Sequence, residues 1–75
     1  MKVYKYSNWT AFRQKLPKER ARTGYYYEIK LFAPEFMHST LFKETTFFTK
    51  RWGWKREIKD TVNYLIFKII FKENE

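Results

Sequence analysis

The stretch Tyr25-Tyr26-Tyr27-Glu28-Ile29-Lys30-Leu31-Phe32 decides the fold class, because its side chains alternate between an apolar row and a mixed row. The apolar row is Tyr25, Tyr27, Ile29 and Leu31, and the mixed row is Tyr26, Glu28, Lys30 and Phe32. Alternation with a period of two is the pattern of a half-buried β-strand. We therefore expect a strand over Tyr25–Phe32 that gives one face to a core. Thr23-Gly24 indicates a turn before it, and Ala33-Pro34 ends it.

Shorter segments on both sides of this strand also carry patterns. Lys2–Tyr6 and the threonine- and phenylalanine-rich Thr45–Lys50 are predicted as strands. Pro34 followed by Glu35 suits the first turn of a short helix that continues to about Phe42.

Trp9–Leu16 is predicted as a helix. Trp9, Phe12 and Leu16 recur at the spacing i, i+3 and i+7, which places them on one helical face. Ser7 or Asn8 would cap this helix, and Pro17 would end it because a residue before proline avoids the α conformation. A basic loop over residues 18–22 would follow.

Lys55–Lys72 is also predicted as a helix. At about 100° per residue, its aliphatic side chains fall within one arc of roughly 140°. These side chains are Ile58, Val62, Leu65, Ile66, Ile69 and Ile70. Its β-branched and aromatic content would suit a strand, but the arc is unbroken along the segment. Tyr64, Phe67 and Phe71 lie outside the arc, so we expect them to pack on another element, a second copy of the chain or a partner.

Together these elements predict an α+β fold, a small antiparallel sheet with a C-terminal helix packed on one face, in a single domain over residues 1–75. A chain of 75 residues buries only about 60% of its unfolded surface, so its core is marginal. The chain has no cysteine and a single histidine, so neither a disulfide nor a zinc site is expected to support it. An aromatic-rich core and association with a partner are the remaining sources of stability.

The chain carries a net charge of +8, with a pI near 9.8. This charge attracts polyanions over roughly 8 Å at physiological salt. Because 44% of the residues are hydrophobic, the charge does not predict disorder. Nucleic acid, an anionic membrane surface and an acidic protein are the candidate partners. We expect a cytoplasmic location, since no signal peptide is visible and no apolar run reaches the ~20 residues that a membrane span needs.

Lys50-Arg51-Trp52-Gly53-Trp54-Lys55-Arg56 is the first candidate site. Its cations flank two indoles, and the glycine permits a sharp turn between them. Exposed rings that stack bases, beside cations that hold phosphates, make up the surfaces that bind single-stranded nucleic acid. The alternative is a solvated basic turn with one or both tryptophans in the core.

A second basic cluster comprises Arg13, Lys15, Lys18, Arg20 and Arg22, opposed only by Glu19. The two clusters would form one backbone-binding patch if they met in space. The alternative is ordinary solvated loop charge. Tyr26 is a further stacking candidate, as strand aromatics are in RNA recognition motifs, although the chain lacks the strand signature of that family.

No residue pattern predicts catalysis, and no metal or cofactor is expected. His38 is the only imidazole, and Ser39 beside it in sequence does not make a nucleophile–base pair. Glu57 and Asp60 are explained by favourable interaction with the positive end of a helix dipole. The chain has two glycines and no glycine-rich phosphate loop. We therefore expect a binding protein rather than an enzyme.

The composition of the whole chain is similar to that of small early proteins of AT-rich tailed phages, which are short, often lack cysteine and are rich in Lys, Phe, Tyr, Ile and Asn. Residues 63–75 show this character most clearly. The resemblance implies a class of action, in which such a protein binds and blocks a host nuclease, toxin, polymerase or defence complex in the host cytoplasm.

We expect a small basic module that binds RNA or single-stranded DNA in a regulatory or inhibitory role, because stacking needs unpaired bases. The alternative is a protein-binding inhibitor that docks its basic, aromatic surface on an acidic host protein without nucleic acid. A homodimer or a complex with a protein partner is expected through Tyr64, Phe67 and Phe71. The spread of aromatics along the chain argues against a peptide that lies on a membrane surface.

Overall fold

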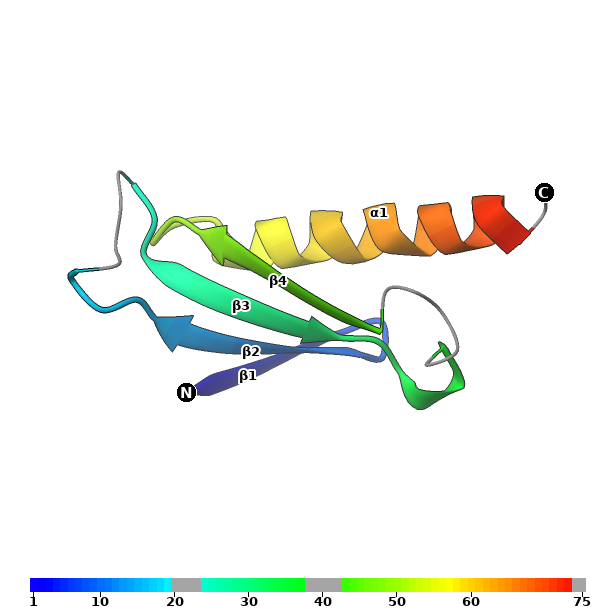
Figure 1. Ribbon diagram of the computed structural model, residues 1–75, viewed down its shortest axis with the longest axis horizontal. Helices are drawn as coiled ribbons and strands as arrows, with labels where there is room; N and C mark the ends of the chain where they lie inside the picture. The colour runs from blue at the N-terminus through cyan, green and yellow to red at the C-terminus, as the bar shows by residue number, and fades with distance from the viewer. Residues whose placement is uncertain (20–23, 38–42, 74–75) are drawn as a thin grey trace.

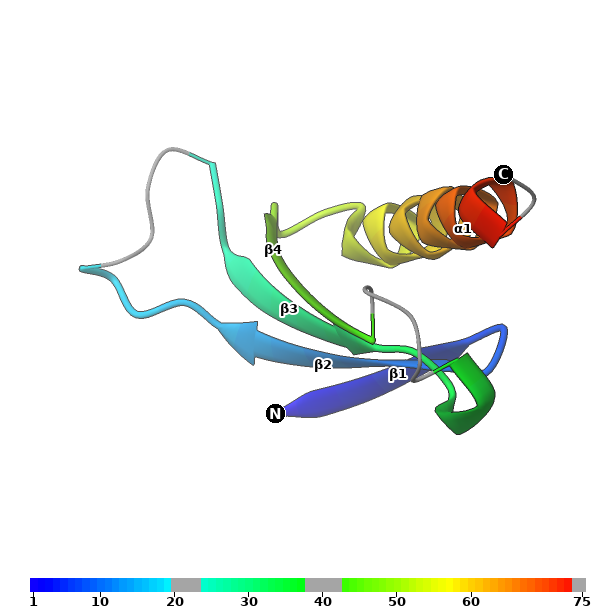
Figure 2. The same ribbon diagram turned by 45° about the vertical axis from the view of Figure 1, so that its right-hand side comes forward.

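The computed structural model describes residues 1–19, 24–37 and 43–73. Its elements are β1 (Lys2–Tyr6), β2 (Trp9–Lys15), β3 (Tyr27–Phe32), the 3-10 helix η1 (Glu35–Met37), β4 (Glu44–Thr49) and α1 (Trp54–Glu73). The four strands form one antiparallel sheet in the order β1-β2-β3-β4, and α1 lies across one face of it (Figures 1 and 2). The predicted α+β fold, with a C-terminal helix on one face of a small antiparallel sheet, is confirmed.

The helix predicted over Trp9–Leu16 is wrong, because this segment forms strand β2. Ser7 and Asn8 do not cap a helix but connect β1 to β2, with positive φ angles of 51° and 69°. Positive φ at both central residues is the geometry of the type I′ turn, which joins two antiparallel strands. The turn sets Tyr6 opposite Trp9, and pairing continues from there to Lys2 opposite Arg13.

The side chains of β2 point alternately to the two faces of the sheet. Trp9 and Ala11 are buried beneath α1, whereas Phe12 lies on the opposite face, where its ring meets that of Phe32 edge-on at 5.5 Å. The apolar residues that suggested one helical face are therefore divided between two faces of a strand. Burial of Trp9 and Ala11 against the helix favours this arrangement over the local helical periodicity.

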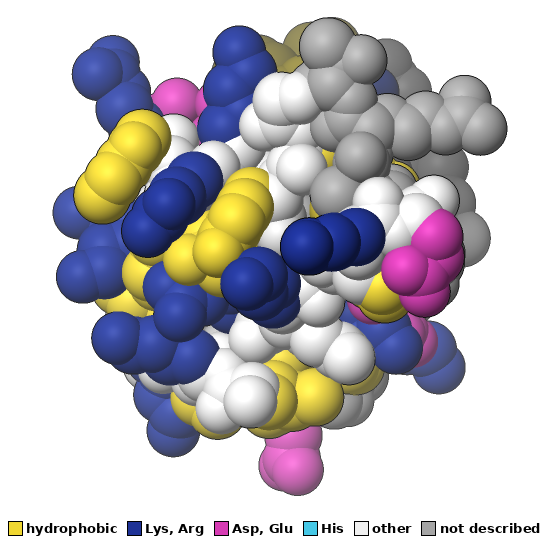
Figure 3. All heavy atoms as spheres, turned by 90° about the vertical axis from the view of Figure 1, so that its left-hand side faces the viewer, with side chains coloured by type: hydrophobic (Ala, Val, Ile, Leu, Met, Phe, Trp, Pro, Cys, Tyr) yellow, Lys and Arg dark blue, Asp and Glu magenta, His cyan; other side chains and the backbone are white. Residues whose placement is uncertain are grey.

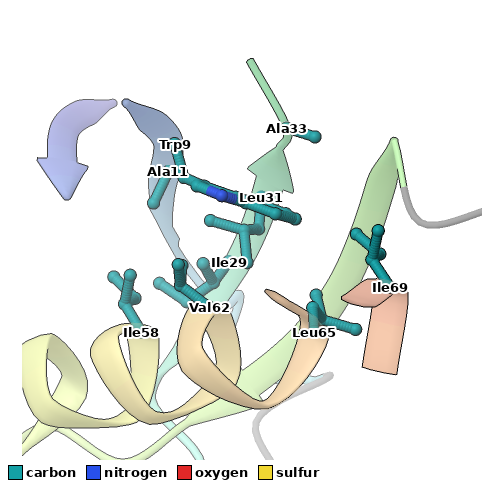
Figure 4. Close-up of a cluster of buried hydrophobic side chains, with 9 residues drawn as sticks. All are labelled: Trp9, Ala11, Ile29, Leu31, Ala33, Ile58, Val62, Leu65 and Ile69. Atoms are coloured by element: carbon teal, nitrogen blue, oxygen red, sulfur yellow. The ribbon is translucent and has the colours of Figure 1, made fainter. Parts of the chain in front are cut away.

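The core lies between the sheet and α1 (Figure 4). Ile29 and Leu31, on the apolar row of the predicted central strand, are fully buried there. The cluster consists of Trp9, Ala11, Ile29, Leu31 and Ala33 from the sheet side, with Ile58, Val62, Leu65 and Ile69 from the helix. β3 begins two residues later than predicted, at Tyr27, and Tyr25 is 48% exposed.

Helix α1 confirms the helix predicted over Lys55–Lys72, but its buried face is narrower than the predicted arc. The buried Ile58, Val62, Leu65 and Ile69 span only about 60° at 100° per residue. The sequence placed Ile70 on this face, but Ile70 is 53% exposed, so that part of the prediction is wrong. The reason is geometric, because a single sheet contacts one narrow side of a helix.

The helix also extends past the ends of the strands (Figure 1). Its 20 residues span about 30 Å at 1.5 Å per residue. The longest strand has seven residues and spans about 23 Å at 3.3 Å per residue.

The exposed fractions of Tyr64, Phe67 and Phe71 are 56%, 66% and 60%, so the sheet leaves these rings uncovered. Phe67 and Phe71 stack on each other, with their ring centroids 6.1 Å apart.

The remaining segments follow the sequence with small shifts. β4 begins and ends one residue before the predicted Thr45–Lys50. Of the short helix predicted from Pro34, only η1 lies within the described residues, and the part over residues 38–42 lies outside them. No helix within the described residues is long and apolar enough to cross a membrane.

Two isoleucines of α1 provide a matched test of this packing. Ile58 is 1% exposed and Ile70 is 53% exposed. We expect Ile58→Ala to lower the free energy of unfolding by about 2–5 kcal/mol because it opens a cavity. Ile70→Ala should change the free energy by no more than about 0.5 kcal/mol. Urea unfolding followed by circular dichroism measures both, and equal losses would contradict the placement of the helix on the sheet.

Candidate nucleic-acid interface

Both basic clusters contribute to the end of the molecule at which α1 begins. In an antiparallel sheet of this order, β2 and β4 end where β3 begins. At this end of the sheet Lys15 pairs with Tyr27, and Tyr27 with Thr49. The turn from β4 into α1 lies at the same end. Lys and Arg side chains gather there around hydrophobic ones (Figure 3). Strand register together with the turn from β4 into α1 therefore brings residues 13–15 and 50–55 to one end of the molecule, which the sequence did not settle.

Arg13 is the best-fixed cation at this end. Its guanidinium carbon lies 4.3 Å from the ring centroid of Tyr27 and 4.5 Å from that of Trp54. Trp54 in turn packs edge-on against Tyr4 and Tyr27, at 5.7 and 6.1 Å. A guanidinium whose faces rest on rings still directs its five N–H donors outward in its own plane. Arg13 is thus half-buried by its neighbours, yet it can bind an anion.

Further cations lie over neighbouring rings. Lys15 Nζ and Arg51 Cζ are 5.2 and 5.4 Å from the ring centroid of Tyr26. Arg51 Cζ is also 5.3 Å from the ring of Trp52, and Lys55 Nζ is 5.6 Å from that of Trp54. We call this set the cation–aromatic surface. It comprises Arg13, Lys15, Arg51 and Lys55 with Tyr26, Trp52 and Trp54.

The two indoles of this surface differ in exposure. Trp52 is 81% exposed. Trp54 is half-buried and packs against the hydrophobic core. The ring of Trp52 is therefore open for stacking. Trp54 instead follows the alternative interpretation of this block, in which a tryptophan packs against the core. Gly53 between them has a φ of +82°, and its carbonyl oxygen accepts a hydrogen bond from Glu57 N–H at 3.0 Å, so the predicted turn leads directly into α1.

A shallow hollow of about 390 Å³ lies on the β2 side of this end. Its lining residues are Met1, Lys2, Arg13, Lys15, Tyr26 and Tyr27, and none of them is acidic. Lys2 was not among the predicted site residues, but its pairing with Arg13 places the two cations side by side. The sequence contained a signal for Lys2, because Lys2, Tyr4 and Tyr6 alternate along the predicted strand and therefore share one face of β1.

Arg56 departs from the other cations of its block. Its Nε lies 3.9 Å from Asp60 Oδ2, one helical turn away, and both side chains are exposed. This is the only ion pair within the described parts of the chain. Arg56 and Lys50 line a second hollow, of about 350 Å³, between the end of β4 and the start of α1. The block over residues 50–56 is therefore divided between two sides of this end.

The other predicted residues are more distant or lie outside the described residues. Lys18 is exposed in the turn after β2, and Arg20 and Arg22 lie outside the described residues. Tyr64, Phe67 and Phe71 lie farther along α1, away from the cation–aromatic surface (Figure 1). No group of His, Asp and Glu side chains in the described residues could hold a metal ion.

Tyr26 differs from its predicted place in the mixed row of its strand. The regular ladder of β3 begins only at Tyr27, and the rings of Tyr26 and Tyr27 pack edge-on at 4.7 Å. A hydrogen bond from Lys15 lowers the pKa of the Tyr26 phenol below its ordinary value of 10.0, and desolvation opposes this change. The charges of Lys15, Arg51 and Arg13 lower the pKa further. The cations around this ring therefore change its acidity.

The Tyr26 phenol provides a test of this arrangement. We expect Lys15→Met to raise the pKa of Tyr26 toward its ordinary value, because it removes the hydrogen bond and one charge. NMR of ¹³C-labelled tyrosine between about pH 7 and pH 11 follows the ionisation. Since folding lowers this pKa, the group stabilises the fold above about pH 10, and this contribution is lost as the pH falls through the lowered value. An unchanged titration of Tyr26 in Lys15→Met would contradict the placement of Lys15.

Comparison with known proteins gives no relative for this chain, since no protein-family model, no curated protein and no solved structure matches it. The chemistry of the cation–aromatic surface therefore rests on its own residues and their geometry.

Proposed function

We propose that this protein binds single-stranded nucleic acid, RNA or DNA, through the cation–aromatic surface. The observation that carries the proposal is the way in which its cations are held. Arg13, Lys15, Arg51 and Lys55 lie over aromatic rings, and the one ion pair of the described residues involves Arg56 instead. Rings fix the position of a cation without neutralising it, so the full charge stays available to phosphates.

The rings favour an unpaired strand over a duplex. The exposed Trp52 offers a face on which a base can stack, and such stacking contributes about 1–3 kcal/mol per base. Bases in a duplex are already stacked on each other and present only their edges. Helix α1 has little of the character of a major-groove recognition helix, because Tyr64, Phe67 and Phe71 occupy much of its exposed face.

The biological role that we propose is regulatory or inhibitory, in the cytoplasm of the cell in which the protein acts. A small chain with a surface for single strands can block access to the strand that it covers. The phage-like composition supports an anti-defence setting, in which the occupied strand belongs to a host nuclease, toxin or defence complex. No catalytic step is part of this proposal.

Salt dependence measures how many phosphates the surface engages. With Lys2, Arg13, Lys15, Arg51 and Lys55 in contact, the plot of log K against log salt for an oligouridylate should slope near −3.5, taking roughly −0.7 per contact. Fluorescence anisotropy between about 50 and 200 mM salt gives this slope. A flat plot, or no binding at the lowest salt, would refute the proposed function.

Matched variants separate contact from overall charge. Arg51→Ala with Lys55→Ala should reduce the slope by about 1.4. Lys5→Ala with Lys30→Ala removes the same charge from exposed positions on the opposite face of the sheet and should leave the slope nearly unchanged. Trp52→Ala should weaken binding by about 1–3 kcal/mol at an unchanged slope. Equal effects of the two double variants would show attraction by net charge without a defined surface.

Protein binding is a second candidate function, and the exposed face of α1 favours it. At roughly 200 Å² per ring, the exposed fractions of Tyr64, Phe67 and Phe71 leave about 360 Å² uncovered. Patches of about this size often mark an interface, although each side of a standard complex buries about 800 Å². We propose that this face contacts a second copy of the chain or a protein partner. An inhibitor that docks on an acidic protein would use the cation–aromatic surface instead of this face.

Sedimentation velocity at micromolar concentrations tests the second copy. We expect a weak dimer that Phe71→Glu converts to a monomer, because the substitution places a charge in the contact. Phe36→Glu is the control, since Phe36 is 78% exposed in η1 and away from α1. A wild-type chain that stays monomeric, with no change in either variant, would exclude the dimer and leave only a partner for this face.

A further inference from the structure

We infer that the hollow between the end of β4 and the start of α1 holds one unpaired guanine of the bound strand. This inference rests on the proposed function and adds a base preference to it. The hollow has a volume of about 350 Å³, enough for a single base with its sugar. Aromatic, basic and acidic side chains all contribute to its lining.

Three of the side chains that line this hollow are aromatic. Trp52 is 81% exposed, Tyr25 48% and Phe48 45%, although rings of this size are usually buried in a small protein. The rings of Tyr25 and Phe48 lie against each other, with centroids 6.2 Å apart and planes inclined at 59°. A base that enters between Trp52 and this pair would cover exposed rings on both of its faces, which is how proteins commonly hold unpaired bases.

The acidic residues in the lining indicate which base edge fits. Glu57 and Asp60 line the hollow, and the only ion pair that holds Asp60 is a 3.9 Å contact with the exposed Arg56. Such an exposed pair is weak, so the carboxylate can accept hydrogen bonds from a ligand. Two carboxylate oxygens match two adjacent donors. Among the four RNA bases, only guanine presents two, its N1–H and its N2 amino group. The exocyclic amino groups of adenine and cytosine each have an acceptor nitrogen beside them, and uracil has a single N–H.

The position of the hollow agrees with a strand that continues onto the cation–aromatic surface. Lys50 and Arg56 in the lining can hold the phosphates on either side of the base. Arg51 lies over the ring of Trp52 and also over Tyr26 on the opposite side of this end. The arrangement thus combines a basic path for the backbone with one carboxylate-lined pocket, and it is this pocket that would distinguish bases.

Oligouridylates of about 12 residues with one central guanosine, inosine, adenosine, cytidine or uridine test this inference by fluorescence anisotropy. We expect the guanosine strand to bind about ten-fold more tightly than the all-uridine strand, the usual scale for one bidentate base contact. Inosine lacks only the N2 amino group, so it should lose most of this preference. The same order is expected in the deoxyribose series, because the discriminating groups belong to the base.

The carboxylates are tested by Glu57→Gln with Asp60→Asn. This double variant should bring the ratio of guanosine to uridine affinity close to one, whether or not it also changes the affinity for every strand. Glu35→Gln with Glu44→Gln makes the same charge change at exposed positions at the other end of the sheet and should keep the ratio. Equal affinities for all five strands, or a guanosine preference that survives in Glu57→Gln/Asp60→Asn, would overturn the pocket while leaving the proposed function intact. Failure of every strand to bind at low salt would overturn both.

Discussion

Arg13 lies over the rings of both Tyr27 and Trp54, and the arrangement of the cation–aromatic surface depends on this contact. It joins the middle of the sheet to the first residue of α1. A cation on an aromatic face contributes about 0.5–1 kcal/mol when exposed and ~2 kcal/mol when desolvated, which matters in a domain with so small a core. Because rings rather than carboxylates hold the guanidinium, the same contact stabilises the fold and leaves a positive charge at the surface.

One helix on four strands leaves other surfaces uncovered, and each has a different character. The end where α1 begins is cationic and aromatic, whereas the far part of α1 exposes Phe67 and Phe71. The 43 × 20 × 19 Å molecule therefore separates the surface that we propose for nucleic acid from the surface that we propose for a protein. A chain that holds a strand at one end and a second protein at the other could bring the two together or prevent their contact.

The sequence predicted correctly those elements in which the local residue pattern and the packing against the rest of the fold favour the same structure. The alternation along Tyr25–Phe32 and the unbroken aliphatic arc of the last segment each survive in β3 and α1. Trp9–Leu16 misled because its apolar spacing suits one helical face, while the deciding feature is the left-handed pair Ser7-Asn8 just before it. A Ser-Asn pair suits a helix cap as well as a hairpin turn, so only the pairing of β1 with β2 distinguishes the two.

The candidate site, too, was only partly predictable from the sequence. The basic and aromatic residue types were evident from the sequence, but their partners depend on cross-strand register. Pairing brings Lys2 to Arg13, and Arg56 pairs with Asp60 one helical turn farther along α1. The hollow that we propose for a base combines residues of β4, α1 and the segment before β3, so no single stretch of sequence carries its pattern.

The three indole N–H groups provide the most direct measurement of the central claim, because each lies in a different environment. Trp9 is buried in the core, Trp54 is half-buried beneath Arg13, and Trp52 is exposed. In a ¹H–¹⁵N NMR titration with an oligouridylate at low salt, the account predicts a large shift for Trp52, a smaller one for Trp54 and none for Trp9. An oligouridylate that binds without moving the Trp52 indole, or that shifts only residues of the distal half of α1, would contradict it.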